Sequence, residues 1–259
     1  GKVVEWDTDG SPVRMIGTHT DITQIKRMQD QLAESNRELD EFAYIASHDL
    51  KAPLRAINNL VTWIEEDVSA TASEDAMKNL ATLKGRVQRM NRLLDDTLSY
   101  ARIDHQSFDG ERISGREMAD GVLGAIDRPA SYQVEFTPQF LSCQLPANPL
   151  EQMLYNLIGN AIKHRDRDNG RVDVRLEETE NDYIITVQDD GPGIDPEYHD
   201  RVFEMFRTLQ SRDRVEGSGM GLAIVRKLVQ VAGGAVTLES KTGQGACFTV
   251  HWPKNKGWP

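Results

Sequence analysis

FAYIASHDLKAPLRAINNL, residues 42–60, places a histidine, an aspartate and a proline inside a pattern that otherwise predicts one amphipathic helix. His48 is two residues from Ala46 and from Leu50, about 160° away from both around the helix, so its side chain should point to solvent. Because Pro53 has no N–H, the carbonyl four residues before it loses its helical partner, and the helix should bend beside His48.

An exposed imidazole can act as a nucleophile through one ring nitrogen when a base holds the other nitrogen. Asp49 is the nearest carboxylate to His48 in the sequence and is the candidate for that base. Taken alone, a histidine followed by an aspartate on a helix surface is more typical of a solvated polar pair. The catalytic interpretation therefore depends on the rest of the chain.

The composition excludes several classes of protein. The 259 residues include 39% apolar residues, enough for packed cores, and carry a formal net charge of −11. This charge argues against binding to nucleic acid or to an anionic membrane surface, since both need clustered Lys and Arg. Cys143 and Cys247 lack metal-ligand or disulfide-framework spacing. No apolar run is long enough to span a bilayer. The start at Gly1 suggests a piece of a longer protein, so a cytoplasmic location is expected for this piece and an upstream membrane anchor stays open.

A heptad-like spacing follows the N-terminal residues. Its apolar members are Ile25, Met28, Leu32, Leu39, Phe42 and Ala46. Alternating steps of three and four predict a coiled-coil signalling helix over residues 24–46. Amphipathic patterns on either side of a loop at 69–74 then predict two long helices, so residues 47–103 should form an antiparallel hairpin. One hairpin buries its two apolar stripes poorly, whereas two hairpins form a four-helix bundle, so a homodimer is expected.

Residues 1–23 contain two short strand-like runs, VVEW and VRMIGTH, joined by the turn-forming DTDGSP. A two-stranded hairpin is marginal alone, so it is expected to be the end of a larger sheet. With the closing tripeptide at 21–23, it resembles the C-terminal strands of a PAS sensor domain. An ordinary terminal hairpin is the alternative.

Polar residues 104–112 break the helical period and predict a linker into a second domain at 113–254. Helical patterns near 114–126, 148–165 and 219–232 alternate there with strand-like runs. Because the runs at 171–178 and 183–189 have no helix between them, antiparallel pairing is expected, with helices on one face of the sheet.

Two motifs in this domain contain residue types that could bind a nucleotide. NLIGNAIKH, residues 156–164, places Asn156, Asn160, Lys163 and His164 on one side of a helix, where amides, an ammonium and an imidazole could meet phosphates and Mg²⁺. In QDDGPGI, residues 188–194, a strand ends before two glycines that allow close approach to a flat ligand. A carboxylate there could accept a hydrogen bond from the amine of adenine. A solvated helix face and a simple turn are the alternatives.

Three more segments follow in order. FEMF, residues 203–206, is by itself more typical of core packing. GSGMGL, residues 217–222, leads into a helix whose free N–H groups and dipole favour an anion, although its spacing is neither that of a Rossmann motif nor that of a P-loop. TGQGACF, residues 242–248, predicts a turn between two closing strands. Between these motifs, residues 207–216 are polar and bounded by glycine, as a mobile lid requires. Arg207, Arg212 and Arg214 are candidates for phosphate contacts, although a place in a solvated loop is more typical for any one of them.

Together these motifs closely resemble those of the sensor histidine kinases of two-component signalling, over residues 24–252. The resemblance implies a multidomain α plus α+β fold: a dimeric antiparallel four-helix bundle, then a Bergerat-type α/β sandwich that binds ATP and Mg²⁺, after the short PAS remnant. It implies phosphorylation of His48 with Asp49 as neighbouring base, Asn160 as Mg²⁺ ligand, and a response regulator receiver domain as partner. The remaining implied ATP-site residues are Asn156, Lys163, His164, Asp189, Gly191, Gly193, Phe203, Phe206, Gly217, Gly219, Gly221 and Leu222.

One position departs from the family pattern. Four residues after the histidine, many members carry Thr or Asn, which positions water for dephosphorylating the partner, whereas this chain has Ala52. Weak phosphatase activity is therefore expected. Two rival functions stay open: a non-catalytic dimeric signalling scaffold, and a serine kinase or ATPase with the same nucleotide fold.

Overall fold

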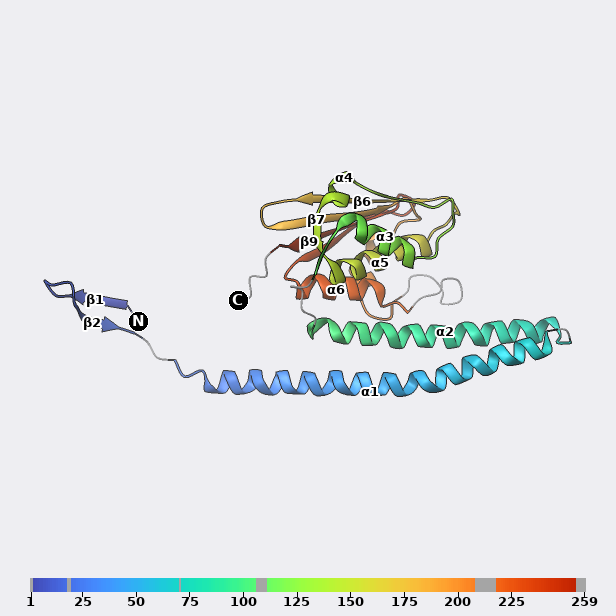
Figure 1. Ribbon diagram of the computed structural model, residues 1–259, viewed down its shortest axis with the longest axis horizontal. Coiled ribbons are helices and arrows are strands. Elements are labelled where there is room, and N and C mark those ends of the chain that lie inside the picture. The colour runs from blue at the N-terminus through green and yellow to red at the C-terminus, as the bar shows by residue number, and fades with distance from the viewer. Residues whose placement is uncertain (1, 18–19, 70, 106–110, 208–217, 255–259) are drawn as a thin grey trace. The chain divides into compact units, whose positions relative to one another are not determined.

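The computed structural model describes residues 2–17, 20–69, 71–105, 111–207 and 218–254. By its internal contacts the chain divides into two units, residues 1–44 and residues 45–259. Each unit is described by itself below, and Figure 1 gives the labels of the helices and strands.

The first unit begins with two paired strands. β1 (Lys2–Trp6) and β2 (Pro12–Ile16) run antiparallel, which confirms the expected hairpin. Their connection is a turn in which Gly10, at φ +84°, donates its N–H to the Asp7 carbonyl. Both faces of the pair are largely exposed, including Trp6 and Met15. Assignment of these strands to a PAS domain stays a prediction.

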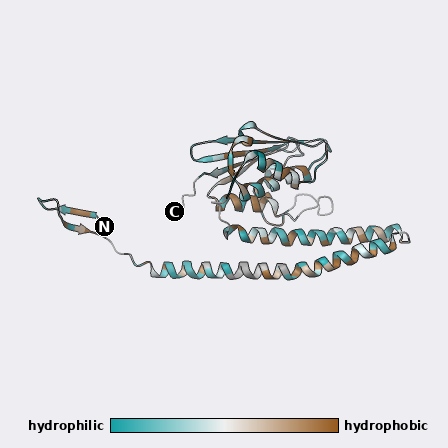
Figure 2. Cartoon of the chain, viewed as in Figure 1, coloured by the Kyte–Doolittle hydropathy of each residue, from teal (hydrophilic) through white to brown (hydrophobic). Residues whose placement is uncertain are grey.

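Two long helices form the expected hairpin. α1 spans Thr23–Val68, and α2 spans Glu74–Arg102 with Ser73 as its N-cap. The helices run antiparallel: Lys51 pairs with Asp95, and Lys84 Nζ lies 2.6 Å from Glu65 Oε2. Figure 2 shows hydrophobic and hydrophilic residues alternating along both helices. Among the described side chains of the two helices, the buried apolar ones are Leu54, Val61, Val87 and Leu98.

Pro53 does not end the helix. α1 continues through it to Val68, with the carbonyl of Asp49 deprived of its usual donor. Figure 1 shows α1 straight over its first half and curving toward α2 over its second half. The curved half is the one that contains His48 and Pro53, while a local bend beside His48 stays a prediction.

The rest of the second unit is an α/β layer structure. Its helices are α3 (Gly115–Ala125), α4 (Pro138–Ser142), α5 (Ala147–Lys163) and α6 (Gly221–Val231). Its strands are β3 (Arg112–Ser114), β4 (Gln133–Phe136), β5 (Gln144–Pro146), β6 (Arg171–Glu178), β7 (Asp182–Asp189), β8 (Ala235–Ser240) and β9 (Ala246–Pro253). Short 3₁₀ helices lie at Ile103–His105, Pro196–Tyr198 and Arg201–Phe203.

Five strands form one sheet in the order β4-β6-β7-β9-β8. The β6–β7 pair is antiparallel, as predicted, and so are β7–β9 and β8–β9, whereas β4 runs parallel to β6. β3 and β5 make a separate antiparallel pair. Figure 1 shows α3, α5 and α6 together on one side of the large sheet.

The core lies between this sheet and these helices. Alternate strand residues such as Val172, Ile185 and Val250 are buried and meet Leu154 and Leu228 from the helices. This period of two in the strands and the apolar faces of α5 and α6 confirm the expected two-layer arrangement. Among the described residues, no helix is both long and apolar enough to cross a membrane.

Candidate active site

The amides of α5 meet the first turn of α6. Asn156 and Asn160 are one helical turn apart, and the Asn156 amide donates from Nδ2 to the Gln152 carbonyl at 2.8 Å. A Cβ placed on Gly221 would lie 3.0 Å from Asn156 Oδ1 and 3.5 Å from Asn160 Nδ2. The absence of a side chain at Gly221 thus lets both amides approach the N-terminus of α6, where the first backbone N–H groups have no partner within the helix.

Lys163 and His164 end the same helix. Lys163 is exposed on the last turn of α5, and His164 is its C-cap, with the backbone N–H donating to the Asn160 carbonyl. Burial lowers the pKa of His164, and the charge of Lys163 lowers it further. The imidazole is therefore neutral at pH 7, so Lys163 supplies the positive charge at this end of α5.

Asp189 ends β7 and is held by two backbone donors. Its Oδ1 accepts from Gly191 N at 2.9 Å and from Ala246 N at 3.2 Å. Burial raises the pKa of Asp189; these two hydrogen bonds oppose the rise, and Asp190 adds to it. Both bonds go to Oδ1, so Oδ2 accepts no hydrogen bond that the structure describes. Such an oxygen can accept a hydrogen bond from an amine of a ligand.

Two glycines allow backbone segments to touch at this site. Gly193 has φ +69°, and a Cβ on it would lie 2.0 Å from the Lys241 carbonyl oxygen. Gly245 has φ +74°, and a Cβ there would lie 2.0 Å from the carbonyl oxygen of Asp189. Only glycine fits both the left-handed conformation and the close approach. The turn at 242–245 is thus packed directly on the segment that carries Asp189.

Asp190 has a different role from Asp189. Arg167 Nη2 lies 2.6 Å from the Asp190 carbonyl oxygen and 2.8 Å from its Oδ2. Arg171 N donates to Asp190 Oδ1 at 2.8 Å. Both carboxylate oxygens of Asp190 are therefore engaged, one by Arg167 before β6 and the other by Arg171 at its start. Asp190 holds the end of β7 in place and is not oriented for a ligand.

Tyr132 lies beneath the same region and was not anticipated from the sequence. The side chain is buried, and its hydroxyl donates to the Ala161 carbonyl of α5 at 3.3 Å. Burial raises the pKa of Tyr132 to about 12, with the charge of Asp189 as the next cause. Tyr132 thus connects the end of α5 with the surroundings of Asp189. A single tyrosine before a short strand carries no pattern that could have predicted this contact.

The two phenylalanines of FEMF differ in environment. Phe203 is half-buried, with its ring edge-on to Phe248 at 6.3 Å between centroids. Phe206 is exposed and has φ +62°, which is unusual for a residue with a side chain. A Cβ on Gly219, itself at φ +73°, would lie 2.8 Å from the Arg207 carbonyl oxygen. The segments 203–207 and 218–222 are therefore in contact, as expected if both of them line the same site.

The other predicted residues differ in how far the structure describes them. Gly217, Arg212, Arg214 and the side chain of His48 lie outside the described part of the structure. Asp49 is exposed on α1. The remaining site residue, Leu222, is half-buried and packs against the core. Arg207 is paired with Glu204, with Nε 2.9 Å from Oε2.

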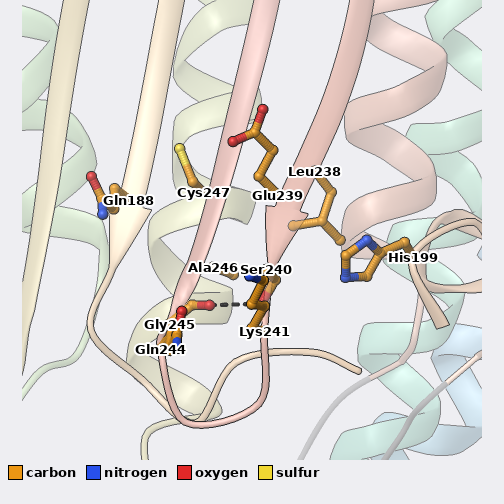
Figure 3. Close-up of a pocket in the computed structure, with 10 residues that line it drawn as sticks. All are labelled: Gln188, His199, Leu238, Glu239, Ser240, Lys241, Gln244, Gly245, Ala246 and Cys247. Atoms are coloured by element: carbon orange, nitrogen blue, oxygen red, sulfur yellow. Dashed lines mark hydrogen bonds between the residues drawn. The ribbon is translucent and has the colours of Figure 1, made fainter. Parts of the chain in front are cut away.

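A pocket of about 500 Å³ lies at the β8–β9 end of the sheet (Figure 3). Figure 3 shows Gln188, Cys247 and Glu239 on neighbouring strands, with His199 at the far side. Among the described residues that line the pocket, none is a predicted nucleotide-site residue. The pocket adjoins the predicted site through Gly245 and Ala246, which contact Asp189, and through Lys241, which contacts Gly193.

Two family models match the chain. The His Kinase A phospho-acceptor domain matches residues 38–106, and the histidine kinase-, DNA gyrase B- and HSP90-like ATPase domain matches residues 146–256. Cyanobacterial phytochrome A of Nostoc sp. is 34% identical over 89% of this chain and 30% of its own length. The methanogenesis regulatory histidine kinase FilI of Methanothrix harundinacea is 31% identical over 91% of this chain and 28% of its own length. The chain thus spans about 30% of such relatives.

Solved structures agree in fold. Full-length ShkA in complex with AMPPNP has a TM-score of 0.62 at 24% identity, covering 82% of this chain and 45% of that one. The Acinetobacter baumannii histidine kinase AdeS has a TM-score of 0.56 at 22% identity, covering 81% of this chain and 98% of that one. With a helical hairpin followed by an ATPase-type α/β domain, and with both matched family models, the chain belongs to the sensor histidine kinases.

Proposed function

We propose that this chain transfers the γ-phosphoryl group of ATP to His48, and then to an aspartate on the receiver domain of a response regulator. The observation that carries the proposal is the meeting of Asn156 and Asn160 with Gly221 at the start of α6. Amides, unpaired backbone N–H groups and the nearby Lys163 are the groups that triphosphate oxygens need.

Asp189 is proposed to select the base. Its Oδ1 is fixed by Gly191 and Ala246, which orients the carboxylate. An ionised carboxylate accepts a hydrogen bond from the exocyclic amine of adenine, whereas the carbonyl of guanine at the same ring position would be repelled. Gly193 and Gly245 keep the surrounding backbone free of side chains, which gives a flat base close access.

Asn160 is proposed to hold Mg²⁺. Nucleotide-site Mg²⁺ is usually bound by one or two protein oxygens together with phosphates and water. An amide oxygen beside the N-terminus of α6 fits that donor set, and no group of three His, Cys, Asp or Glu side chains forms a metal site among the described residues. When bound, Mg²⁺ would neutralise charge on the phosphates. Lys163 adds a positive charge from the protein. His164 is neutral, so it can offer a hydrogen bond but no charge.

The transfer itself needs little from the protein beyond placement. A ring nitrogen of His48 attacks the γ-phosphorus in line, an N–P bond forms, and the bond to the bridging oxygen breaks so that ADP leaves. Asp49 accepts the hydrogen bond of the second ring nitrogen and offsets the positive charge that develops on the imidazole. The phosphoramidate is then passed to a carboxylate of the regulator, and Ala52 provides no polar group to hold a hydrolytic water, so phosphatase activity is weak.

The active form is proposed to be a homodimer. One hairpin buries Leu54 and Val61 but leaves Leu50, Leu60 and Met90 more than half exposed. Pairing two hairpins into a four-helix bundle would remove these apolar side chains from water. We propose that this segment lies in the cytoplasm, where ATP and receiver domains occur together.

Incubation of the full chain with radiolabelled ATP and Mg²⁺ tests the proposal. We expect label that is acid-labile and alkali-stable, that is lost in His48→Gln, and that is retained in His251→Gln, a change at an exposed histidine of β9. Label that survives acid and the His48 change would indicate a hydroxyl acceptor and a serine kinase. Nucleotide binding without label under any condition would indicate a scaffold.

A further inference from the structure

The hydroxyl of Tyr132 lies at the C-terminal end of α5. It donates a hydrogen bond to the Ala161 carbonyl at 3.3 Å. Because α5 ends at Lys163, the N–H four residues after Ala161, which would normally bond to this carbonyl, lies outside the helix. The side chain of Tyr132 is 1% exposed, and burial raises its pKa to about 12, so the hydroxyl keeps its proton at neutral pH. Tyr132 thus supplies, from a distant segment, a hydrogen bond that the end of the helix does not make for itself.

The ring of Tyr132 is held by packing on Gly170, just before β6. A Cβ on Gly170 would lie 2.3 Å from Cε2 of the ring and 2.8 Å from Cζ, the carbon that carries the hydroxyl. The residues on either side bond to the same connection between α5 and β6. The Ser131 hydroxyl donates to the Asp168 carbonyl at 2.9 Å, and the Gln133 N–H donates to the Gly170 carbonyl at 2.9 Å. The backbone around Tyr132 therefore fixes where its hydroxyl meets α5.

The turn of α5 that Tyr132 contacts is the one proposed to hold the metal. Asn160, the proposed Mg²⁺ ligand, directly precedes Ala161. Its Nδ2 lies 3.5 Å from the position of a Cβ on Gly221, so its amide is at the start of α6. A helix end whose carbonyl groups lack donors frays, and each residue of a helix turns its side chain by about 100°. Fraying at Ala161 would therefore turn the Asn160 amide away from α6.

We propose that Tyr132 is a positioning residue for Mg²⁺: its bond to the Ala161 carbonyl keeps the last turn of α5 helical, so that the Asn160 amide stays beside the start of α6. This inference rests on the proposed function, because it presumes that Asn160 holds Mg²⁺. Tyr132 acts through Asn160 and not on the nucleotide itself. Its loss should weaken the contribution of Mg²⁺ to nucleotide binding and spare the hydrogen bonds that orient Asp189, which come from Gly191 and Ala246.

Calorimetric titration of the full chain with ADP, at saturating Mg²⁺ and in EDTA, tests this inference. The Kd in EDTA divided by the Kd with Mg²⁺ measures how far the metal strengthens binding, and we call it the Mg²⁺ ratio. Tyr132→Phe keeps the ring on Gly170 and removes the hydroxyl. We expect its Mg²⁺ ratio to fall about fivefold, with the Kd in EDTA within about twofold of the unchanged chain.

Tyr183→Phe is the matched control. Tyr183 is also buried, and its hydroxyl accepts from Arg112 Nη2 of β3 at 2.6 Å, in a contact that does not involve α5. It lies six residues before Asp189 on β7, about 20 Å along the strand. We expect this control to lower the urea midpoint about as much as Tyr132→Phe does and to leave the Mg²⁺ ratio unchanged.

Gly170→Ala is a second variant, because its added Cβ would push the Tyr132 ring away from α5. It should lower the Mg²⁺ ratio as well. An equal Mg²⁺ ratio in Tyr132→Phe and Tyr183→Phe would overturn the inference. So would a Tyr132→Phe chain whose Kd rises by the same factor with and without Mg²⁺, since the hydroxyl would then support the whole site. The proposed function fails separately, if the unchanged chain binds no ADP.

Discussion

Replacing Gly245 with alanine should damage both the stability of the ATP-binding domain and its affinity for nucleotide. At φ +74° the left-handed conformation costs an alanine about 1–2 kcal/mol. The added Cβ would also lie 2.0 Å from the Asp189 carbonyl oxygen, so the two segments must separate by about 1 Å or more. That movement strains two hydrogen bonds, from Ala246 N to Asp189 Oδ1 and from Ser240 Oγ to the Gly245 carbonyl.

The loss in free energy of unfolding can be summed from the conformational cost and the two hydrogen bonds. Losing one hydrogen bond to a carboxylate and one neutral hydrogen bond adds about 2–4 kcal/mol to the conformational cost, for a total of about 3–6 kcal/mol. With a urea slope of about 2 kcal/mol/M, the unfolding midpoint should fall by about 1.5–3 M. Because Asp189 loses one of its two orienting donors, the Kd for ADP should rise about tenfold or more.

Gly243 in the same turn provides the matched control. It has φ +80°, but a Cβ there would meet nothing within 4 Å. Gly243→Ala should therefore show only the conformational cost, a midpoint lower by about 0.5–1 M with ADP binding unchanged. Buried Trp252 on β9 reports unfolding by its fluorescence, since Trp6 and Trp63 are already exposed. Midpoints that agree for the two variants within about 0.3 M would refute the reasoning from the Gly245 contact.

Three further predictions concern the same domain. Arg167→Ala frees the carbonyl and carboxylate of Asp190, so the Kd for ADP should rise about threefold in a calorimetric titration; an unchanged Kd would show that Arg171 alone holds this turn. Ser114→Ala removes the capping box of α3 and should cost about 1 kcal/mol in urea unfolding, a result contradicted by an unaltered midpoint. Burial raises the pKa of Asp189, so protonation removes its acceptor charge at a higher pH than for an ordinary aspartate; ADP affinity should decline as pH falls between about 7 and 4, and a flat profile would exclude an ionised Asp189 as base-reading group.

Helix periodicity and glycine placement predicted much of this molecule. The spacing of Asn156 and Asn160 on α5 was enough to predict that they share a face, because helical geometry is local. The glycines of residues 242–248 predicted a turn, and the left-handed φ values of Gly243 and Gly245 agree with it. The strand pairing of 171–178 with 183–189 followed from the short connection between them.

Contacts between distant segments could not be predicted in this way. The parallel pairing of β4 with β6 joins strands that are separated by α4, β5 and α5, and β4 itself has only four residues. The ion pairs Arg167–Asp190 and Lys227–Asp104 each connect residues far apart in sequence. Single polar residues carry no period, so their partners depend on tertiary packing. Tyr132 is the clearest case, since the hydrogen bond from its hydroxyl to the Ala161 carbonyl depends on where α5 ends.

The continuity of α1 through Pro53 has a mechanical consequence. A helix of 46 residues is a rod about 69 Å long, and its stiffness comes from the ladder of backbone hydrogen bonds along it. Because Pro53 has no N–H, one of these backbone hydrogen bonds is not made, the one to the carbonyl of Asp49 in the turn that carries His48. Bending applied at either end of α1 should therefore concentrate in the turn of His48, so the most flexible point of the helix coincides with the proposed phosphoacceptor.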